Sequence, residues 1–546
     1  MTVFLKTLKY FTIVLAVLLL TDCKKSTEIT IASQIDLNSF AHTSGKDIIG
    51  TNGMPVYLKG VSFGNNVWTT APIMYDTDHS EIDYQRVRQM GMNTVRFYLN
   101  YQYFESDTAP YQYLQSGWDW LDKNIRWAKA HNIFLILNMH VPQGGFQSQG
   151  NGDALWLNTE NQNRLTALWQ AIATRYKEEN QIIGYGLLNE PVPTQSIEQW
   201  RALAQSLINT IRINDKNHII FVERALYIKG NYIEDANYNF PDVKDSNLVY
   251  EFHNYQPFTY THQLLDFANL GDGGKYPDIL KPEMTSLPNW YKATTNNPII
   301  PIGDSNWHYY EGVKYQITDS DISIAYPALV GAKTLGSIYF DDLNIKEYDE
   351  NLQFVRTVMT LDLNSLTNWN FWTANGQGVY ALSNQGHTDN VSIRISDATG
   401  DCNLSNQSNM FIPKSNYYYQ INGWMKGSHI GQNAYGQFRL DFNHSDTPIK
   451  VRDKNYLIYI LSQYEQWANT KNVPLYMGEF GAGLPCFENN KGGLTYVRDM
   501  VSISMEKNIH FNYHVYNGGY FGIYTLDANQ PPYFINQPLI DLFKSL

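Results

Sequence analysis

Short apolar runs alternate with amphipathic helical patterns along the first half of the chain. Residues 81–91 follow a helical period and stop at a glycine, and the apolar run NTVRFYL (93–99) comes next. The same relation recurs at the apolar runs 56–63, 133–140, 182–191, 218–223 and 247–255. Helices and strands joined by short linkers are typical of parallel βα units. These six strands predict a (β/α)8 barrel or a doubly wound sheet.

The alternation breaks between about residues 260 and 450, where Asn, Ser, Gly and Tyr are frequent and the pattern indicates strands and loops. Helical patterns then return, and they are followed by the apolar runs 473–483 and 509–517. These supply strands seven and eight if the middle block is an insertion. No Gly-x-Gly-x-x-Gly loop follows the first strand, which disfavours a nucleotide-binding sheet. We therefore predict an α/β fold, a TIM barrel with a β-sandwich inserted between strand six and its following helix.

The insertion has an unusual internal order. Residues 307–350 resemble the C-terminal half of a jelly-roll carbohydrate-binding module, and residues 368–396 and 417–427 resemble its N-terminal half. Half a sandwich could not cover its own core, so one circularly permuted sandwich is the better prediction. Whether this domain binds sugar or only packs on the barrel stays open.

The N-terminus predicts export. Lys6 and Lys9 precede an apolar run that is too short to span a bilayer, and the ending Leu-Thr-Asp-Cys resembles a bacterial lipoprotein signal. Cys23 would then be lipidated, although Asp22 departs from the usual small residue and an ordinary cleaved signal peptide is the alternative. We predict a signal at 1–23, a tether at 24–40, barrel segments at 41–265 and 451–546, and the sandwich at 266–450. The expected location is the cell envelope or surface of a Gram-negative bacterium, with a lipid anchor as the only membrane contact.

Composition narrows the partners. A net charge of −12 disfavours nucleic acid, and the 14% aromatic content suits both a large core and surfaces that stack on sugar rings. We expect a monomer that binds a polysaccharide or oligosaccharide. Cys402 and Cys486 could form a disulfide in an oxidising compartment, but nothing in the sequence places them together.

Polar side chains gather where the predicted barrel strands end, which is where barrels place their function. These residues are Asn65, Asn66, Arg96, His140, Asn189, Glu190, Glu223, His253, Tyr255, Glu479, His514 and Tyr516. Ordinary turn residues would be expected at the strand ends of a barrel without a site, so the accumulation indicates one.

Glu190 and Glu479 end strands four and seven and would face each other across the barrel mouth. Glycoside hydrolysis needs such a pair, one carboxyl as an acid and the other as the second carboxylate. Arg96 would keep a nucleophilic carboxylate ionised, and Tyr255 could donate a hydrogen bond to it. Glu190 follows apolar residues and precedes Pro191, so desolvation would raise its pKa toward that of an acid.

The motifs NTVRF, LNMH, LLNEP, HNY and GEFG, in this order, resemble glycoside hydrolase family 5, a retaining family of barrels. The resemblance covers about residues 47–260 and 454–546. It implies that Glu190 is the acid/base, that Glu479 is the nucleophile and that Asn189 binds the sugar 2-hydroxyl. The remaining active-site set that it implies is Arg96, His140, His253 and Tyr255.

One departure concerns the substrate platform. The family usually ends strand eight with a Trp, whereas this chain has His514 flanked by Tyr513 and Tyr516. Trp68 and Trp156, in loops after strands one and three, are further platform candidates, and His514 and Tyr516 complete the predicted substrate-binding set.

Plainer interpretations remain for several residues. Arg96 could be a structural ion pair, His140 and His253 could be core histidines, and Glu223 is more simply structural because no family motif includes it. No His, Asp and Glu cluster has catalytic-metal spacing, and retaining hydrolysis needs neither metal nor cofactor.

The sequence therefore predicts an endo-acting, retaining β-glycoside hydrolase, with β-1,4-glucan as first substrate and β-mannan or β-1,3-glucan as alternatives. A transglycosylase would share every catalytic residue. The alternative from another class is a non-catalytic surface glycan-binding lipoprotein, which would have no need for the carboxylate pair.

Overall fold

The computed structural model describes residues 40–68, 79–229, 240–283, 289–301, 303–333, 336–428, 434–525 and 534–546. The chain divides into two compact units. The first, which we call the barrel unit, comprises Met1–Asn254, Leu461–Gly481 and Val501–Leu546. The second, the sandwich unit, comprises Tyr255–Ile460 and Ala482–Met500.

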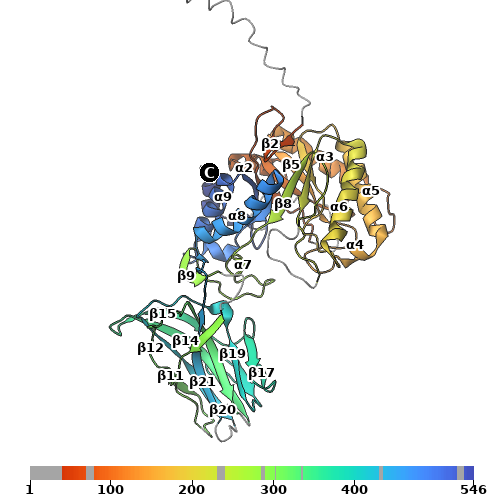
Figure 1. Ribbon diagram of the computed structural model, residues 1–546. Helices are drawn as coiled ribbons and strands as arrows, with labels where there is room; N and C mark the ends of the chain where they lie inside the picture. Colours follow the sequence, from red (N-terminus) through yellow and green to blue (C-terminus); the bar gives the residue numbers. More distant parts are fainter. Residues whose placement is uncertain are drawn as a thin grey trace, which may run out of the picture. The chain divides into compact units, whose positions relative to one another are not determined.

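Eight parallel strands close into a barrel in the order β23-β24-β3-β4-β5-β6-β7-β8, which confirms the predicted fold (Figure 1). The strands are β3 (Lys59–Phe63), β4 (Thr94–Asn100), β5 (Phe134–Val141), β6 (Ile182–Gly186), β7 (Ile219–Glu223), β8 (Leu248–His253), β23 (Leu475–Phe480) and β24 (Ile509–Tyr513).

The helices between these strands are α2 (Glu81–Gln89), α3 (Gln115–Ala130), α4 (Asp153–Leu157), α5 (Thr159–Tyr176), α6 (Ile197–Asn214), α8 (Lys454–Lys471) and α9 (Gly493–Glu506), and α10 (Gln537–Ser545) follows β24. In α3, buried Trp118, Leu121, Ile125 and Ala128 recur every three or four residues and form one apolar face.

The barrel interior is apolar near the amino ends of its strands. Ile183, Ile219, Val249 and Tyr476, each at the first or second position of its strand, belong to one buried cluster with Ile48 of β2 (Asp47–Ile49). β2 pairs with β1 (His42–Ser44). The opposite ends carry the polar residues, so the apolar and chemical ends of the barrel are separate.

The sandwich unit holds two antiparallel sheets, with orders β10-β21-β13-β19-β16 and β11-β20-β14-β18-β17. β12 pairs with β20 in the second sheet, and β15 pairs with β14. The strands are β10 (Asn289–Ala293), β11 (His308–Glu311), β12 (Tyr315–Gln316), β13 (Ile324–Ala332), β14 (Ser337–Tyr348), β15 (Phe354–Leu361), β16 (Asn370–Thr373), β17 (Val379–Ser383), β18 (Ser392–Ser396), β19 (Asp401–Ser405), β20 (Tyr418–Ser428) and β21 (Tyr435–His444). Both sheets mix strands from the two predicted halves, as one sandwich requires. The likeness to a carbohydrate-binding module and the permutation stay predictions.

In chain order the insertion lies between β8 and α8, as predicted. After β8 come α7 (Phe258–Thr261) and β9 (Asp278–Pro282), and β9 pairs with β22 (Val451–Arg452) just before α8. The compact unit is larger than the predicted insert 266–450, because it also includes 255–265, 451–460 and 482–500.

The two described cysteines are free and buried, so the disulfide left open by the sequence is not formed. Cys402 Sγ donates to the carbonyl of Gly331 at 2.9 Å, and Cys486 Sγ donates to that of Tyr260 at 3.1 Å. Burial raises the pKa of both thiols to about 11. Both groups therefore act as small core residues.

Over the described ranges, the helices are all too short or too polar to cross a bilayer. The predicted signal peptide, Cys23 and nearly all of the predicted tether fall within residues 1–39, outside the described residues.

Candidate active site

Arg96 of β4 is the hub of a buried charge network at the carboxyl end of the barrel. Its Nη1 donates to Glu479 Oε1 at 2.8 Å, its Nε lies 2.7 Å from Glu251 Oε1, and its Nη2 lies 3.4 Å from Glu223 Oε2. The Arg96 side chain is fully buried. A buried guanidinium needs such partners, because an unpaired charge would be very costly there.

Two amides complete the contacts of Arg96. Its Nη2 also donates to Asn189 Oδ1 at 2.9 Å and to Asn138 Oδ1 at 3.1 Å. Asn138 Nδ2 lies 3.2 Å from His140 Nδ1. Residues predicted from strands two, three, four and seven therefore meet in one network, as parallel strands of a barrel require.

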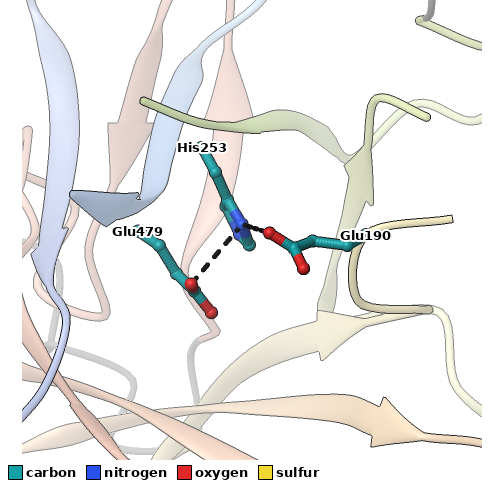
Figure 2. Close-up of side chains that lie close together, drawn as sticks. All are labelled: Glu190, His253 and Glu479. Carbon is teal, nitrogen blue, oxygen red and sulfur yellow. Dashed lines mark hydrogen bonds and ion pairs between the residues drawn. The ribbon is translucent and has the colours of Figure 1, made fainter. Parts of the chain in front are cut away.

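His253, at the end of β8, lies between the two predicted catalytic carboxylates (Figure 2). Its Nδ1 is 2.9 Å from Glu190 Oε1 and 3.6 Å from Glu479 Oε2. Its Nε2 is 3.4 Å from Glu223 Oε1. Burial alone would lower the pKa of His253, but the negative charge of Glu479 and the hydrogen bond to Glu190 hold it well above its ordinary value. His253 is thus a second cation in the network.

Glu190 stands just beyond β6 in a backbone conformation that non-glycine residues rarely adopt, with φ of +43°. Its N–H donates to Glu223 Oε2 at 3.0 Å, which helps to hold that conformation. The side chain of Glu190 is 16% exposed and that of Glu479 is 6% exposed. Glu190 is therefore the carboxyl of the pair that is more open to solvent.

The electrostatics separate the carboxyl groups. Burial alone would raise the pKa of Glu479, but the positive charges of His253 and Arg96 hold it well below its ordinary value, so this carboxyl is ionised at neutral pH. Burial raises the pKa of Glu223 well above its ordinary value, which reduces the negative charge held near Arg96. One carboxylate oxygen of Glu190 lies within 4.8 Å of one of Glu479.

An aromatic group borders the carboxylates. Tyr98 stacks on His140 with ring centroids 3.8 Å apart, and Trp68 stands edge-on to both rings at 6.1 and 5.9 Å. A Cβ on Gly64 would lie 2.6 Å from the Trp68 ring, so only glycine permits this packing. Trp68 is 42% exposed and keeps its place as a platform candidate.

A comparison of sequences relates part of the chain to a known family. Residues 49–300 match the family model described as Cellulase (glycosyl hydrolase family 5). This part of the chain is similar to glycosyl hydrolase family 5. Glu190 lies inside the matched range and Glu479 lies outside it, so the pairing of the two carboxyl groups rests on the structure.

Curated relatives agree with this family. Endoglucanase C of Acetivibrio thermocellus is 33% identical over 196 residues, which cover 35% of this chain and 54% of that protein. Cellodextrinase A of Ruminococcus flavefaciens is 26% identical over 38% of this chain and 60% of its own length. A beta-xylosidase of Phanerodontia chrysosporium is 29% identical over 31% of this chain and 36% of its own length. The chain spans about half the length of the first of these relatives.

Two predicted platform residues are not on an exposed surface. Trp156 is 6% exposed and donates its Nε1–H to Gln147 Oε1 at 2.7 Å. Tyr516 is fully buried and donates its hydroxyl to Asp83 Oδ1 at 2.7 Å. Both have structural partners, which differs from the prediction that they bind sugar.

Two other predicted residues, His514 and Tyr255, have neighbours that the sequence did not predict. His514 Nδ1 lies 3.7 Å from Oε2 of Glu479, the predicted nucleophile. Tyr255 begins the sandwich unit, where its ring centroid lies 5.0 Å from that of His262. The hydrogen bond expected from Tyr255 to Glu479 stays a prediction.

Sequence reasoning missed Tyr98, Asn138 and Glu251, and it interpreted Glu223 as structural. The first three were detectable, because each is two positions from a predicted site residue in the same strand. Strand side chains alternate between faces, so such neighbours point the same way. Glu223 ends β7 and contacts Arg96, His253 and the N–H of Glu190.

The site also gathers side chains that can bind metals, which the sequence spacing did not predict. Glu190, His253 and Glu479 form one such group, and Glu223, Glu251 and His253 form another. Both share His253, and Arg96 contacts an acid of each group. The positive charge that a metal ion would supply is already present, so we interpret the groups as parts of the ion-pair network.

Proposed function

We propose that this chain is a retaining β-glycoside hydrolase that cleaves a β-linked polysaccharide internally, with β-1,4-glucan as the first candidate. The observation that carries the proposal is the pair of carboxyl groups that share His253, with oxygens within 4.8 Å of each other. Retaining glycosidases hold their carboxyl groups about 5–5.5 Å apart, and inverting ones hold them at about 6.5–9.5 Å.

The two carboxyl groups take different roles in the proposed reaction. Glu479, kept ionised by Arg96 and His253, attacks the anomeric carbon while Glu190 gives its proton to the leaving oxygen. The glycosidic bond breaks as the bond to Glu479 forms. Glu190 then takes a proton from water, and the water oxygen displaces Glu479 from the anomeric carbon.

His253 supports both states of Glu190 in this scheme. When Glu190 has lost its proton, its carboxylate faces the imidazolium Nδ1 at 2.9 Å. The same nitrogen lies 3.6 Å from Glu479, whose negative charge disappears when the glycosyl bond forms. His253 can therefore stabilise whichever of the two carboxyl groups is charged.

The choice of substrate rests on the relatives. The endoglucanases and the cellodextrinase among the relatives favour a β-glucan as substrate. The beta-xylosidase among them is the reason to test xylan as well. β-Mannan and β-1,3-glucan are the alternatives within the same chemistry. A binding-only protein is disfavoured, because three buried acidic groups around one arginine are costly unless they serve a reaction.

The remaining proposals concern the location and state of the protein. We propose export with a lipid on Cys23, which metabolic labelling with a palmitate analogue tests, with Cys23→Ala as the unlabelled control. We further propose that the protein is a monomer without a cofactor and that the sandwich unit assists substrate binding. Sedimentation and pull-down on insoluble glycans test these points.

The catalytic proposal is tested by hydrolysis of β-1,4-glucan, β-mannan, β-1,3-glucan and xylan, with products resolved by chromatography. We expect cleavage of β-1,4-glucan into mixed oligosaccharides, with the β-configuration in the first product observed by proton NMR. Cleavage of none of these glycans would refute the proposal. Release of an α-configured first product would refute the retaining mechanism.

A further inference from the structure

The hydroxyl of Tyr98 has three polar contacts, one of which is with the proposed nucleophile. Tyr98 lies in β4, two residues beyond Arg96, and it is fully buried. Its oxygen is 2.5 Å from Glu479 Oε1, 2.9 Å from Ser62 Oγ and 3.1 Å from His514 Nδ1. A phenol has one proton to donate and can accept two hydrogen bonds, so three partners match its capacity.

The partners fix the direction of these hydrogen bonds. An ionised carboxylate can only accept, so the proton of Tyr98 goes to Glu479. The Ser62 hydroxyl then donates to the Tyr98 oxygen, and its own oxygen accepts from Asn512 Nδ2 at 2.6 Å. Asn512 Nδ2 also donates to the carbonyl of Gly478 at 3.1 Å. A relay thus runs from Asn512 through Ser62 and Tyr98 to Glu479.

The relay fixes one oxygen of Glu479. Oε1 accepts from both Tyr98 and Arg96 Nη1, at 2.5 and 2.8 Å. Oε2 lies 3.6 Å from His253 Nδ1 and 3.7 Å from His514 Nδ1. We propose that Tyr98 is a positioning residue that holds Oε1 of Glu479 and so fixes the orientation of this carboxylate.

His514 contributes to the same arrangement at the position where the family usually has a platform Trp. Burial lowers the pKa of His514, so its ring is neutral at neutral pH. With the Tyr98 proton committed to Glu479, a proton on Nδ1 of His514 allows it to donate to the Tyr98 oxygen. His514, which stands where the family usually has a Trp, thus adds a hydrogen bond to the hydroxyl of Tyr98.

This inference rests on the proposed hydrolase function. It concerns the carboxylate of Glu479, which has several titratable groups around it. The titratable and charged groups that face Glu479 are Arg96, Tyr98, His140, Glu190, Glu223, Glu251, His253 and His514. Hydrogen bonding to the ionised form lowers the pKa of a carboxyl, so loss of the Tyr98 hydroxyl should raise that of Glu479.

The test compares Tyr98→Phe with a matched control, Tyr185→Phe, using an aryl β-cellobioside. Tyr185 is also a fully buried tyrosine of a barrel strand whose hydroxyl donates to a carboxylate, Asp215 Oδ2 at 2.8 Å. For Tyr98→Phe we expect kcat to fall by on the order of 10- to 100-fold with little change in KM. The acid limb of kcat/KM should move to higher pH, whereas Tyr185→Phe should keep the wild-type profile.

Ser62→Ala is the second variant, which serves if Tyr98→Phe does not fold. It removes the donor to Tyr98 and leaves the Tyr98–Glu479 contact in place, so kcat should fall by about 3- to 10-fold, with the acid limb moving in the same direction. A wild-type pH profile and kcat in the folded variants would overturn the positioning role. Failure of the wild-type protein to cleave any glycoside would instead overturn the proposed function.

Discussion

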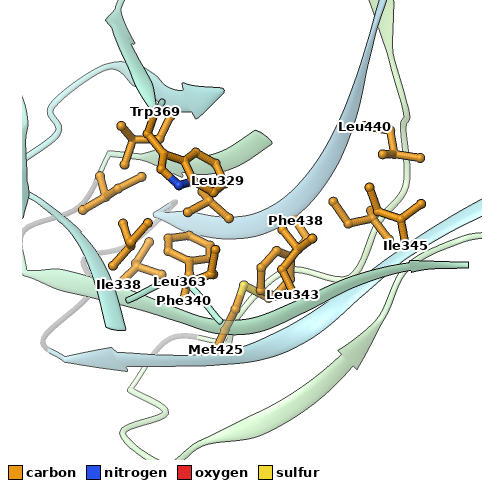
Figure 3. Close-up of a cluster of buried hydrophobic side chains, with 14 of the residues drawn as sticks. Leu329, Ile338, Phe340, Leu343, Ile345, Leu363, Trp369, Met425, Phe438 and Leu440 are labelled. Atoms are coloured by element: carbon orange, nitrogen blue, oxygen red, sulfur yellow. The ribbon is translucent and has the colours of Figure 1, made fainter. Parts of the chain in front are cut away.

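The carboxyl end of the barrel and the interior of the sandwich are both buried, but their chemistry is opposite. The sandwich core consists of side chains such as Leu329, Phe340, Leu343 and Phe438, packed between two sheets (Figure 3). The barrel end buries Glu223, Glu251 and Glu479 around Arg96. The first arrangement stabilises the fold by removing apolar surface from water, and the second costs desolvation that its ion pairs offset only in part.

This difference between an apolar core and a buried group of charges indicates which region supports the fold and which supports a reaction. A core of interlocking apolar groups responds to substitution by losing stability. Substitution in a preorganised network of charges disturbs the orientation and protonation state of the catalytic groups, which lowers the rate of the reaction. Single substitutions in the two regions should therefore separate activity from stability.

The largest effect is expected for Glu479→Gln. The amide keeps the size of the side chain but cannot form the glycosyl bond, so kcat should fall by at least about 10³-fold. Affinity for a cello-oligosaccharide, measured by calorimetry, should stay within about fivefold of wild type. Retention of more than a tenth of the wild-type kcat would contradict the assignment of the nucleophile.

Phe340→Ala should show the opposite pattern. Phe340 of β14 is fully buried in the sandwich core, and truncation of such a ring costs about 3–5 kcal/mol of the free energy of unfolding. Denaturant unfolding followed by tryptophan fluorescence measures the loss, and kcat on a soluble aryl glycoside below the transition should stay within about threefold. A variant that is fully stable but has lost its kcat would break the comparison.

Trp68→Ala should weaken substrate binding. The ring is 42% exposed beside Tyr98 and His140, and loss of a stacking surface should raise KM by roughly tenfold, with a smaller change in kcat. Trp156→Phe is the matched control, because Trp156 is buried and should leave KM unchanged. Equal values of KM for wild type and Trp68→Ala would remove Trp68 from the platform candidates.

The smallest effect should appear in the dependence of the wild-type kcat/KM on pH, whose acid limb should lie below the ordinary pKa of a glutamic acid. Glu479 must be ionised to attack, and its pKa is held well below the ordinary 4.5, so activity is lost only as the pH falls through that lowered value. His253 has a pKa well above the ordinary 6.5, so it keeps its charge through neutral pH. An inflection of kcat/KM on the acid side above about 4.5 that belongs to Glu479 would contradict this balance of charges.

Much of the fold and the site could be predicted because strands and charges leave regular marks in sequence. All eight barrel strands coincide with predicted apolar runs, and the strand ends supplied Arg96, Glu190, His253 and Glu479. The even spacing that aligned Tyr98 with Arg96 was also visible in the sequence. The spacing alone could not predict the contact of Tyr98 with Glu479, because these two residues are 381 positions apart in the chain.

The parts that could not be predicted depend on loop paths and tertiary contacts. Trp156 was predicted as a platform because the sequence placed it in a loop after strand three, but it lies in α4 and donates its indole N–H to Gln147. Tyr516 bonds to Asp83 of α2, over 400 positions earlier in the chain. The limits of the two compact units likewise follow from contacts in space, which place residues 482–500 with the sandwich.

The most direct test of the account is covalent trapping with an activated 2-deoxy-2-fluoro-β-cellobioside. The fluorine slows both steps, and the good leaving group lets the first step proceed, so a retaining enzyme accumulates its glycosyl intermediate. We expect peptide mass spectrometry to find one added sugar on Glu479 and none in Glu479→Gln. A label on another residue, or rapid substrate turnover by the wild-type protein without any covalent label, would contradict the central claim.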